Sequence, residues 1–244
     1  MPTFDLAIFV PLLAAHMLSD FALQTDSIAR SKGRPLTLLL HLLITGLCAY
    51  LLLGDFSEWR LPLLVTASHG LIDLLKTRLS TARVSEAGAF VADQAAHLAV
   101  IFALSSLDWS RLKIFDPWWF EQNPVSYLHL LVIISGIIAN TLAAGHFIAK
   151  ALPAMISSDP KELPVDSGLY RAGRYIGHLE RLLLLIFVYS GQLAAAGFLI
   201  AAKSVLRFQK ANESRRETEY ILVGTLLSFT LGIALAFATK LLLG

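Results

Sequence analysis

Long apolar runs alternate with short polar stretches along the whole chain. An apolar run of about 20 residues is long enough to cross a bilayer as an α-helix. Seven runs meet or approach this length: 4–24, 36–54, 61–77, 87–106, 125–151, 182–203 and 219–243. The pattern therefore predicts an all-α protein, and specifically a polytopic helical membrane protein with six or seven transmembrane helices.

The composition supports this fold class. Hydrophobic residues make up 56% of the 244 residues and charged residues 16%, whereas a soluble domain carries about 25% charged residues. We expect one integral membrane domain over residues 1–244. Its first four helices lie in 1–106, and the remaining helices, with a basic stretch at 203–216, lie in 124–244. The lipid bilayer is the expected partner, and no motif in the chain indicates nucleic-acid binding.

Basic residues in the short loops predict an orientation. The stretches 25–34 and 76–85 each contain three Lys or Arg residues, whereas every tryptophan falls in the stretches 55–60 and 107–123. Because cytoplasmic loops carry an excess of Lys and Arg, 25–34 and 76–85 are predicted to be cytoplasmic. The cations at 203–216 disagree with this alternation. Either one apolar run does not cross, or the basic stretch is an amphipathic helix at the membrane surface.

Histidine and aspartate recur at a helical spacing inside the first four apolar runs. Three pairs are separated by four residues, and a further histidine lies between the first and second pairs. These seven residues are His16 and Asp20, His41, His69 and Asp73, and Asp93 and His97. On a helix, residues four apart share one face, with Cβ atoms about 5–6 Å apart. Ionisable residues within a membrane segment are costly and mark functional sites by default.

Alternating helix directions bring these residues to one side of the membrane. His16 and Asp20 lie late in the first run and His41 lies early in the second. His69 and Asp73 likewise lie late in the third run, and Asp93 and His97 lie early in the fourth. We therefore expect all seven in the same half of the bilayer, which the loop charges identify as the cytoplasmic half.

The residue types favour metal chemistry. Histidine and carboxylate together bind zinc, iron or manganese, and an aspartate near a ligating histidine can accept its other ring N–H. The candidate ligands of a divalent transition metal are His16, His41, His69, Asp93 and His97. Asp20 and Asp73 are candidate catalytic carboxylates. We expect no Lys or Arg beside Asp20, Asp73 or Asp93 within the apolar runs, so these carboxylates require protonation, a cation or an ion pair. A single pair would indicate an interhelical hydrogen bond, but three pairs with His41 favour metal or proton chemistry over polar packing or solute transport.

The second half of the chain contains a different polar set. Glu180 and Arg181 precede the sixth apolar run, and Lys203 and Arg207 follow it. These residues are either ion pairs at helix ends or an anion-binding group. In the functional interpretation, Arg181, Lys203 and Arg207 bind a lipid headgroup or another phosphate-bearing substrate, because guanidinium groups suit phosphate. Glu180 then orients Arg181 or acts as a third catalytic carboxylate.

Several of these motifs together resemble one protein family. They are the run 16–24, the pairs His69/Asp73 and Asp93/His97, the triplet 179–181, and the segments 219–220 and 224–226. In this combination the chain resembles a family of bacterial inner-membrane proteins known as domain of unknown function 3307. The resemblance implies a bacterial inner-membrane location and implies no activity.

The predicted function is a membrane-embedded, metal-dependent enzyme, a hydrolase that acts on an amphiphilic or phosphate-bearing substrate at the cytoplasmic leaflet. Two alternatives remain open. The same residues suit a divalent-cation or proton-coupled transporter, and polar packing alone suits a structural or accessory membrane subunit.

Overall fold

Every regular element of the described chain is helical. The structure is a computed structural model that describes residues 4–25, 28, 31, 33–79, 85–107, 109, 117–119, 121–156, 167–208 and 215–244, the side chains of 156, 167–172, 206–208 and 215–218 excepted. Within these residues there is no strand. The chain divides into two compact units, Met1–Ile138 and Ala139–Gly244, which are described separately. The expected single domain stays a prediction.

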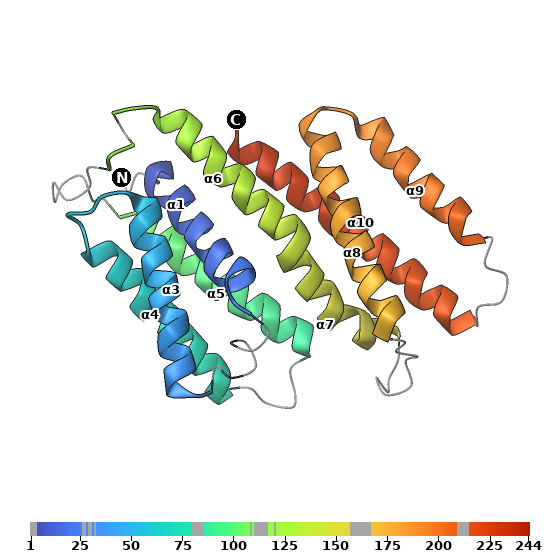
Figure 1. The fold of residues 1–244 in the computed structure, drawn as a ribbon, viewed down its shortest axis with the longest axis horizontal. Helices are drawn as coiled ribbons and strands as arrows, with labels where there is room; N and C mark the ends of the chain where they lie inside the picture. The colour runs from blue at the N-terminus through green and yellow to red at the C-terminus, as the bar shows by residue number, and fades with distance from the viewer. Residues whose placement is uncertain are drawn as a thin grey trace. The chain divides into compact units, whose positions relative to one another are not determined.

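Among its described residues, the first unit contains five α-helices and one π-helix, and Figure 1 labels the α-helices. They are α1 (Leu6–Met17), η1 (Leu18–Ala22), α3 (Pro35–Leu53), α4 (Arg60–Leu79), α5 (Glu86–Ser105) and α6 (Pro124–Ile138). Helix α1 packs against α3, α5 and α6, while α4 packs against both α3 and α5. The α1 helix therefore lies at the centre of this unit.

Local signals in the sequence begin and end these helices. The Asp5 side chain accepts a hydrogen bond from the Ala7 backbone N–H at the start of α1, and Ser85 caps α5 in the same way through Gly88. Such caps satisfy backbone donors that have no partner within the helix. Pro35 occupies the first turn of α3, and Gly54 ends that helix with φ of 74°, a conformation that glycine adopts without steric cost.

Helices α3 and α5 each bury one narrow stripe that begins with polar residues and continues with apolar ones. In α3 the buried residues are His41, Thr45, Ala49 and Leu53, and in α5 they are Asp93, His97, Ile101 and Ser105. The apolar ends of the stripes join in a core of Ile8, Leu12, Ala15, Ala49, Leu53, Leu61, Val65, Ile101 and Trp109. The polar ends form the cluster described below.

The second unit is also helical. It contains η3 (Ala139–Ala143), α7 (Ala144–Ile156), α8 (Ser167–Tyr189), α9 (Leu193–Phe208) and α10 (Arg215–Leu242). Helix α10 packs against α7, α8 and η3, and apolar side chains from α8, α9 and α10 form a core around Leu184, Ala196 and Phe229.

The predicted helix at 182–203 is wrong. The chain turns at Ser190–Gln192, between α8 and α9, and Gly191 has φ of 72°. The apolar composition continues through this turn, so the hydropathy pattern predicts one helix where the structure has two.

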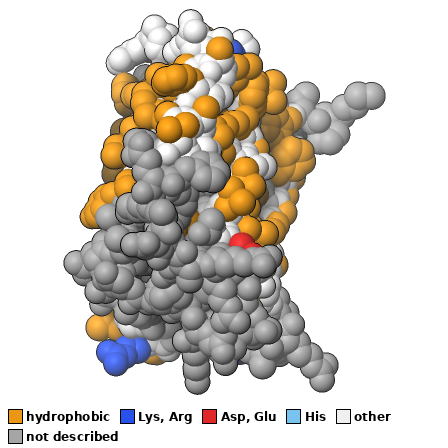
Figure 2. Space-filling model, turned by 90° about the vertical axis from the view of Figure 1, so that its right-hand side faces the viewer, with side chains coloured by type: hydrophobic (Ala, Val, Ile, Leu, Met, Phe, Trp, Pro, Cys, Tyr) orange, Lys and Arg blue, Asp and Glu red, His pale blue; other side chains and the backbone are white. Residues whose placement is uncertain are grey.

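Four helices are long and apolar enough to cross a membrane by length and composition: Pro35–Leu53, Glu86–Ser105, Pro124–Met155 and Glu219–Leu242. Two shorter apolar helices are Leu6–Ala22 and Leu193–Val205. The prediction of an all-α fold is thus confirmed for the described residues, whereas the count of six or seven membrane-crossing helices is not. Figure 2 shows a broad hydrophobic area on one face of the described surface.

Candidate functional site

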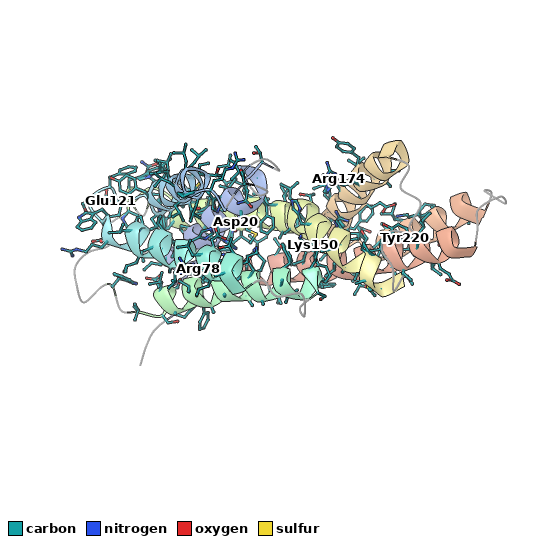
Figure 3. All side chains as sticks on the ribbon, turned by 90° about the horizontal axis from the view of Figure 1, so that it is seen from below. Asp20, Arg78, Glu121, Lys150, Arg174 and Tyr220 are labelled. Carbon is teal, nitrogen blue, oxygen red and sulfur yellow. The ribbon has the colours of Figure 1, made fainter. Side chains whose placement is uncertain are left out.

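The structure brings together all seven His and Asp residues that the sequence singled out in the first unit. Helices α1, α3, α4 and α5 and the π-helix η1 supply them, and their exposed fractions run only from 0% at His41 to 9% at Asp20. The members are His16, Asp20, His41, His69, Asp73, Asp93 and His97, here called the His/Asp cluster. Figure 3 labels Asp20 among these helices.

The π-helix η1 positions Asp20. At this point the Leu23 N–H bonds to the Leu18 carbonyl, five residues earlier, so the turn is wider than an α-helical turn. His16 Nδ1 and Asp20 Oδ2 are 3.8 Å apart, and the Ser19 hydroxyl lies 3.1 Å from Asp20 Oδ1. Single π-turns within helices are frequent at functional sites.

Asp20, His41 and His69 form one group of candidate metal ligands, and Asp73 lies beside the two histidines of this group. Asp20 Oδ1 lies 3.5 Å from His41 Nε2 and 3.3 Å from His69 Nε2. Asp73 Oδ2 lies 3.6 Å and 3.7 Å from the same two nitrogens, which are 2.9 Å apart. Tetrahedral ligands with bonds of about 2.0–2.2 Å lie about 3.3–3.6 Å from one another. The four nitrogen–oxygen distances are close to this range, whereas the two nitrogens are closer together than in a metal site.

Without a cation the same atoms form a hydrogen-bonded chain. The Gln24 side-chain amide lies 3.3 Å from His41 Nδ1; when the amide donates there, His41 carries its proton on Nε2. That N–H then donates to His69 Nε2. A metal on both Nε2 atoms requires His41 to move its proton to Nδ1, where the Gln24 carbonyl oxygen can accept it. Gln24 is suited to either state.

The other side of the cluster contains His16, Asp93 and His97. His16 Nε2 lies 3.1 Å from Gln94 Oε1 and donates to it. The Gln94 amide in turn lies 3.2 Å from Asp93 Oδ2. Three buried atoms here have no hydrogen-bond partner among the described residues: His16 Nδ1, Asp93 Oδ1 and His97 Nε2. Native structures rarely leave buried polar atoms unsatisfied without a reason.

Lys76 corrects the expectation that no lysine or arginine lies beside the three carboxylates, because it pairs with Asp93. Its Nζ lies 2.7 Å from Asp93 Oδ2, and the lysine side chain is 44% exposed, against 5% for the Asp93 side chain. The lysine thus reaches the cluster from the surface. It lies at the end of an apolar run, where the sequence suggests a charged loop residue. The sequence alone therefore does not predict its contact with Asp93. With neutral imidazoles, three aspartates and this lysine leave a formal charge of −2.

A cavity of about 10 Å³ adjoins the cluster. His16, His69 and His97 line it together with Ser68, Thr45 and apolar side chains. This volume is close to the minimum that one water molecule needs. The cavity therefore offers a place for one water beside three imidazoles.

Three predicted site residues of the second unit, Glu180, Arg181 and Lys203, are paired within that unit. Lys203 Nζ lies 2.6 Å from Glu180 Oε2. Arg181 is 3% exposed; its Nε donates to the Asn140 carbonyl and one Nη donates to Ser228 Oγ. The other Nη donates to the Thr141 carbonyl. Because a π-helix leaves carbonyls without their usual α-helical donors, Arg181 satisfies the carbonyls of η3.

His178 completes this arrangement. Its Nδ1 lies 2.8 Å from the Thr141 carbonyl and donates to it. Burial, and after it the charge of Arg181, lower the pKa of His178, which keeps the imidazole neutral at neutral pH. These contacts favour a packing role for Arg181. Its role in substrate binding, and those of Lys203 and Glu180, stay predictions, and the side chain of Arg207 lies outside the described residues.

Comparisons with known proteins match the first half of the chain. Residues 8–122 match the model of a family described as protein of unknown function, DUF3307. No curated protein and no solved structure matches the chain. The matched stretch contains the whole His/Asp cluster, and the later motifs lie outside it. The expected resemblance is therefore confirmed: over residues 8–122 the chain is similar to the DUF3307 family.

Proposed function

We propose that the protein is a membrane-embedded metalloenzyme whose His/Asp cluster binds a divalent transition metal. The observation that carries this proposal is the set of distances from Asp20 Oδ1 and Asp73 Oδ2 to the Nε2 atoms of His41 and His69, 3.3–3.7 Å. Two neutral imidazoles and two carboxylates are a donor set that suits zinc, iron or manganese. A divalent ion also offsets the formal charge of −2 in the cluster.

The distribution of side chains supports the membrane location. In α3 the inward stripe contains His41 and Thr45, while large apolar residues face outward. Leu36, Leu39, Leu43, Leu47 and Leu51 are each 50% exposed or more. Exposed apolar surface of this extent needs a lipid or protein partner. Polar groups inside and leucine outside suit a lipid environment, and the family resemblance favours the bacterial inner membrane.

The proposed reaction is hydrolysis. A divalent ion held by Asp20, His41 and His69 with one position open would supply a Lewis acid and would lower the pKa of a water molecule toward about 7. His16 Nδ1 has no hydrogen-bond partner among the described residues, and His16 lines the cavity that fits one water. His16 is therefore the proposed general base: it accepts the proton of the attacking water and returns it to the leaving oxygen. This exchanges the roles expected from the sequence, because Asp20 and Asp73 become ligands.

The proposed substrate is an amphiphile with a phosphate or ester bond at the cytoplasmic leaflet. Lys76 extends from the surface to Asp93 and marks the side on which the cluster is nearest to water. Lys76 and Arg78 end α4 on that side, which by the excess of cations in cytoplasmic loops is cytoplasmic. Arg181 and Lys203 are not part of the proposal, because their donors are engaged within the second unit.

A divalent-cation transporter is the second candidate. The enclosure of the cluster favours it, because side chains that are at most 9% exposed suit an ion better than a lipid. The two functions differ in whether a covalent bond breaks.

Two assays on the purified protein separate them. In the first, the protein is incubated with bacterial lipid extract, with and without a chelator, and lipid species are followed by mass spectrometry. In the second, proteoliposomes are assayed for Zn²⁺ and Mn²⁺ uptake. We expect chelator-sensitive loss of a lipid species that His41→Ala abolishes and His129→Ala, at an exposed site, does not. Uptake with the same dependence on His41 and intact lipids would replace the enzyme with the transporter.

A further inference from the structure

The metal site proposed above leaves Asp93 and His97 unused. They lie one turn apart on α5, with exposed fractions of 7% and 3%. Asp93 Oδ1 and His97 Nε2 are 3.7 Å apart, and neither atom has a hydrogen-bond partner among the described residues. The partners of Asp93, which are Lys76 and Gln94, both bind its other oxygen. Two adjacent ligand-type atoms are thus buried without a hydrogen-bond partner among the described residues.

Asp73 completes a ligand group with these two residues. One ligand atom each from Asp73, Asp93 and His97 lies within 4.8 Å of the others. Asp73 also faces His41 and His69 through Oδ2. A carboxylate has two oxygens, so it can contact two cations at once. Protein sites with two metal ions hold them about 3.5–4 Å apart, which one bridging carboxylate allows.

We propose that Asp73, Asp93 and His97 form a second divalent-cation site, with Asp73 bridging the two ions. This inference rests on the proposed function for its first ion. The ligands of the second ion are Asp93 Oδ1, His97 Nε2 and the Asp73 carboxylate, and the two ions together form a dinuclear hydrolytic centre.

The charges predict that the second ion binds more weakly than the first. One divalent ion already offsets the formal charge of −2, so a second ion leaves the centre at +2. Lys76 adds to the repulsion, because its ammonium group lies 2.7 Å from the same Asp93 carboxylate. A centre with this excess charge favours an anionic substrate such as a phosphodiester, whose single negative charge together with that of hydroxide restores neutrality.

The test titrates Mn²⁺ into the purified full-length protein in detergent and records both binding isotherms and electron paramagnetic resonance spectra. Two Mn²⁺ ions bridged by a carboxylate are magnetically coupled, whereas one ion gives a six-line spectrum. For the wild type we expect two binding steps, with the coupled spectrum only after the second.

Two substitutions move the second step in opposite directions. His97→Ala is expected to remove the second step and the coupled spectrum while the first step remains. Lys76→Met is expected to strengthen the second step about tenfold or more, because it removes a positive charge beside the Asp93 carboxylate. Lys203→Met is the matched control: it breaks the pair with Glu180 in the second unit and should change neither step.

The outcomes distinguish this inference from the proposed function. A single step with a six-line spectrum in the wild type, unchanged by Lys76→Met, would overturn the second site and leave the first intact. No Mn²⁺ or Zn²⁺ binding by well-folded protein would overturn both. If His97→Ala does not fold, Lys76→Met alone still decides, because the inference requires it to strengthen the second step.

Discussion

At the scale of single residues, His41 links the protonation of the cluster to its proposed ligand. It has no exposed surface, its Nε2 faces His69 and both carboxylates, and its Nδ1 faces Gln24. One imidazole nitrogen can bind a metal only when the other carries the proton. The Gln24 amide can donate to Nδ1 or, after rotation, accept from it. Gln24 is therefore expected to set the tautomer of His41.

Gln24→Ala should accordingly weaken metal binding without abolishing it. Loss of a residue that orients a metal-binding histidine typically lowers affinity about 10–100-fold, and we expect a Zn²⁺ affinity reduced within this range. Competition with a fluorescent chelator measures it. Gln122→Ala, at an exposed position, is the control. Equal affinities for the two variants would remove Gln24 from the metal site.

Arg181 has a different task in the second unit. Arg181→Met removes the donors to the Asn140 carbonyl, the Thr141 carbonyl and the Ser228 hydroxyl, and of these the Thr141 carbonyl keeps His178 as a partner. We expect the free energy of unfolding to fall by about 3 kcal/mol, measured as thermal or denaturant unfolding in detergent. Arg174→Met, at an exposed site, should change it by less than about 0.5 kcal/mol. Metal content should stay the same in both. Full stability with lost lipid turnover would instead assign Arg181 to the substrate.

At the scale of helices, the spacing of residues predicts contacts within a helix better than it predicts where a helix ends. His and Asp at a spacing of four indicate one buried face, and each pair does share one: His69 and Asp73 are 4% and 2% exposed. The predicted run at 182–203 is apolar throughout, yet it contains the turn at Gly191. A hydropathy pattern does not record a change of backbone direction. The Ser-Gly pair at 190–191 is a turn signal, but the apolar residues on both sides of it favour a continuous helix in the hydropathy pattern.

The turn between α8 and α9 can be tested with two glycines. Gly191 has φ of +72° and open space around it, so Gly191→Ala meets only backbone strain and should cost about 1–2 kcal/mol of unfolding free energy. Gly197 lies inside α9, also with open space. Gly197→Ala should therefore stabilise the protein by about 0.5–1 kcal/mol. Unfolding in detergent measures both, and equal effects would mean that α8 and α9 are one continuous helix.

At the scale of the whole molecule, the polar residues gather inside a surface rich in leucine. Convergence of the cluster could be predicted because alternating helices bring late and early positions to one side. The distances between atoms of the cluster could not be predicted, because they depend on the π-turn at Leu18–Ala22 and on how closely α1, α3, α4 and α5 pack. Lys76 was missed for a similar reason: a residue at a helix end reads as a loop charge until the neighbouring helix brings Asp93 to it.

The membrane orientation predicts opposite exposure for the two ends of the first unit. After Cys48 is replaced by Ser, a cysteine at Ser85 should be labelled from the cytoplasmic side and one at Gln122 from the periplasmic side. A membrane-impermeant maleimide on intact and permeabilised cells measures this. Labelling of both positions from one side would exclude the orientation, and with it a site that opens toward the cytoplasmic leaflet.

The central claim is that the His/Asp cluster binds a divalent metal ion, and metal content tests it most directly. Protein purified without chelators should contain zinc, iron or manganese at about one equivalent or more when measured by plasma mass spectrometry. His69→Ala should lose most of this metal and His129→Ala should retain it, with both variants folded. Folded wild-type protein that contains no transition metal and takes up none when it is supplied would contradict the claim. Hydrogen bonds among His41, His69 and the aspartates would then explain the cluster.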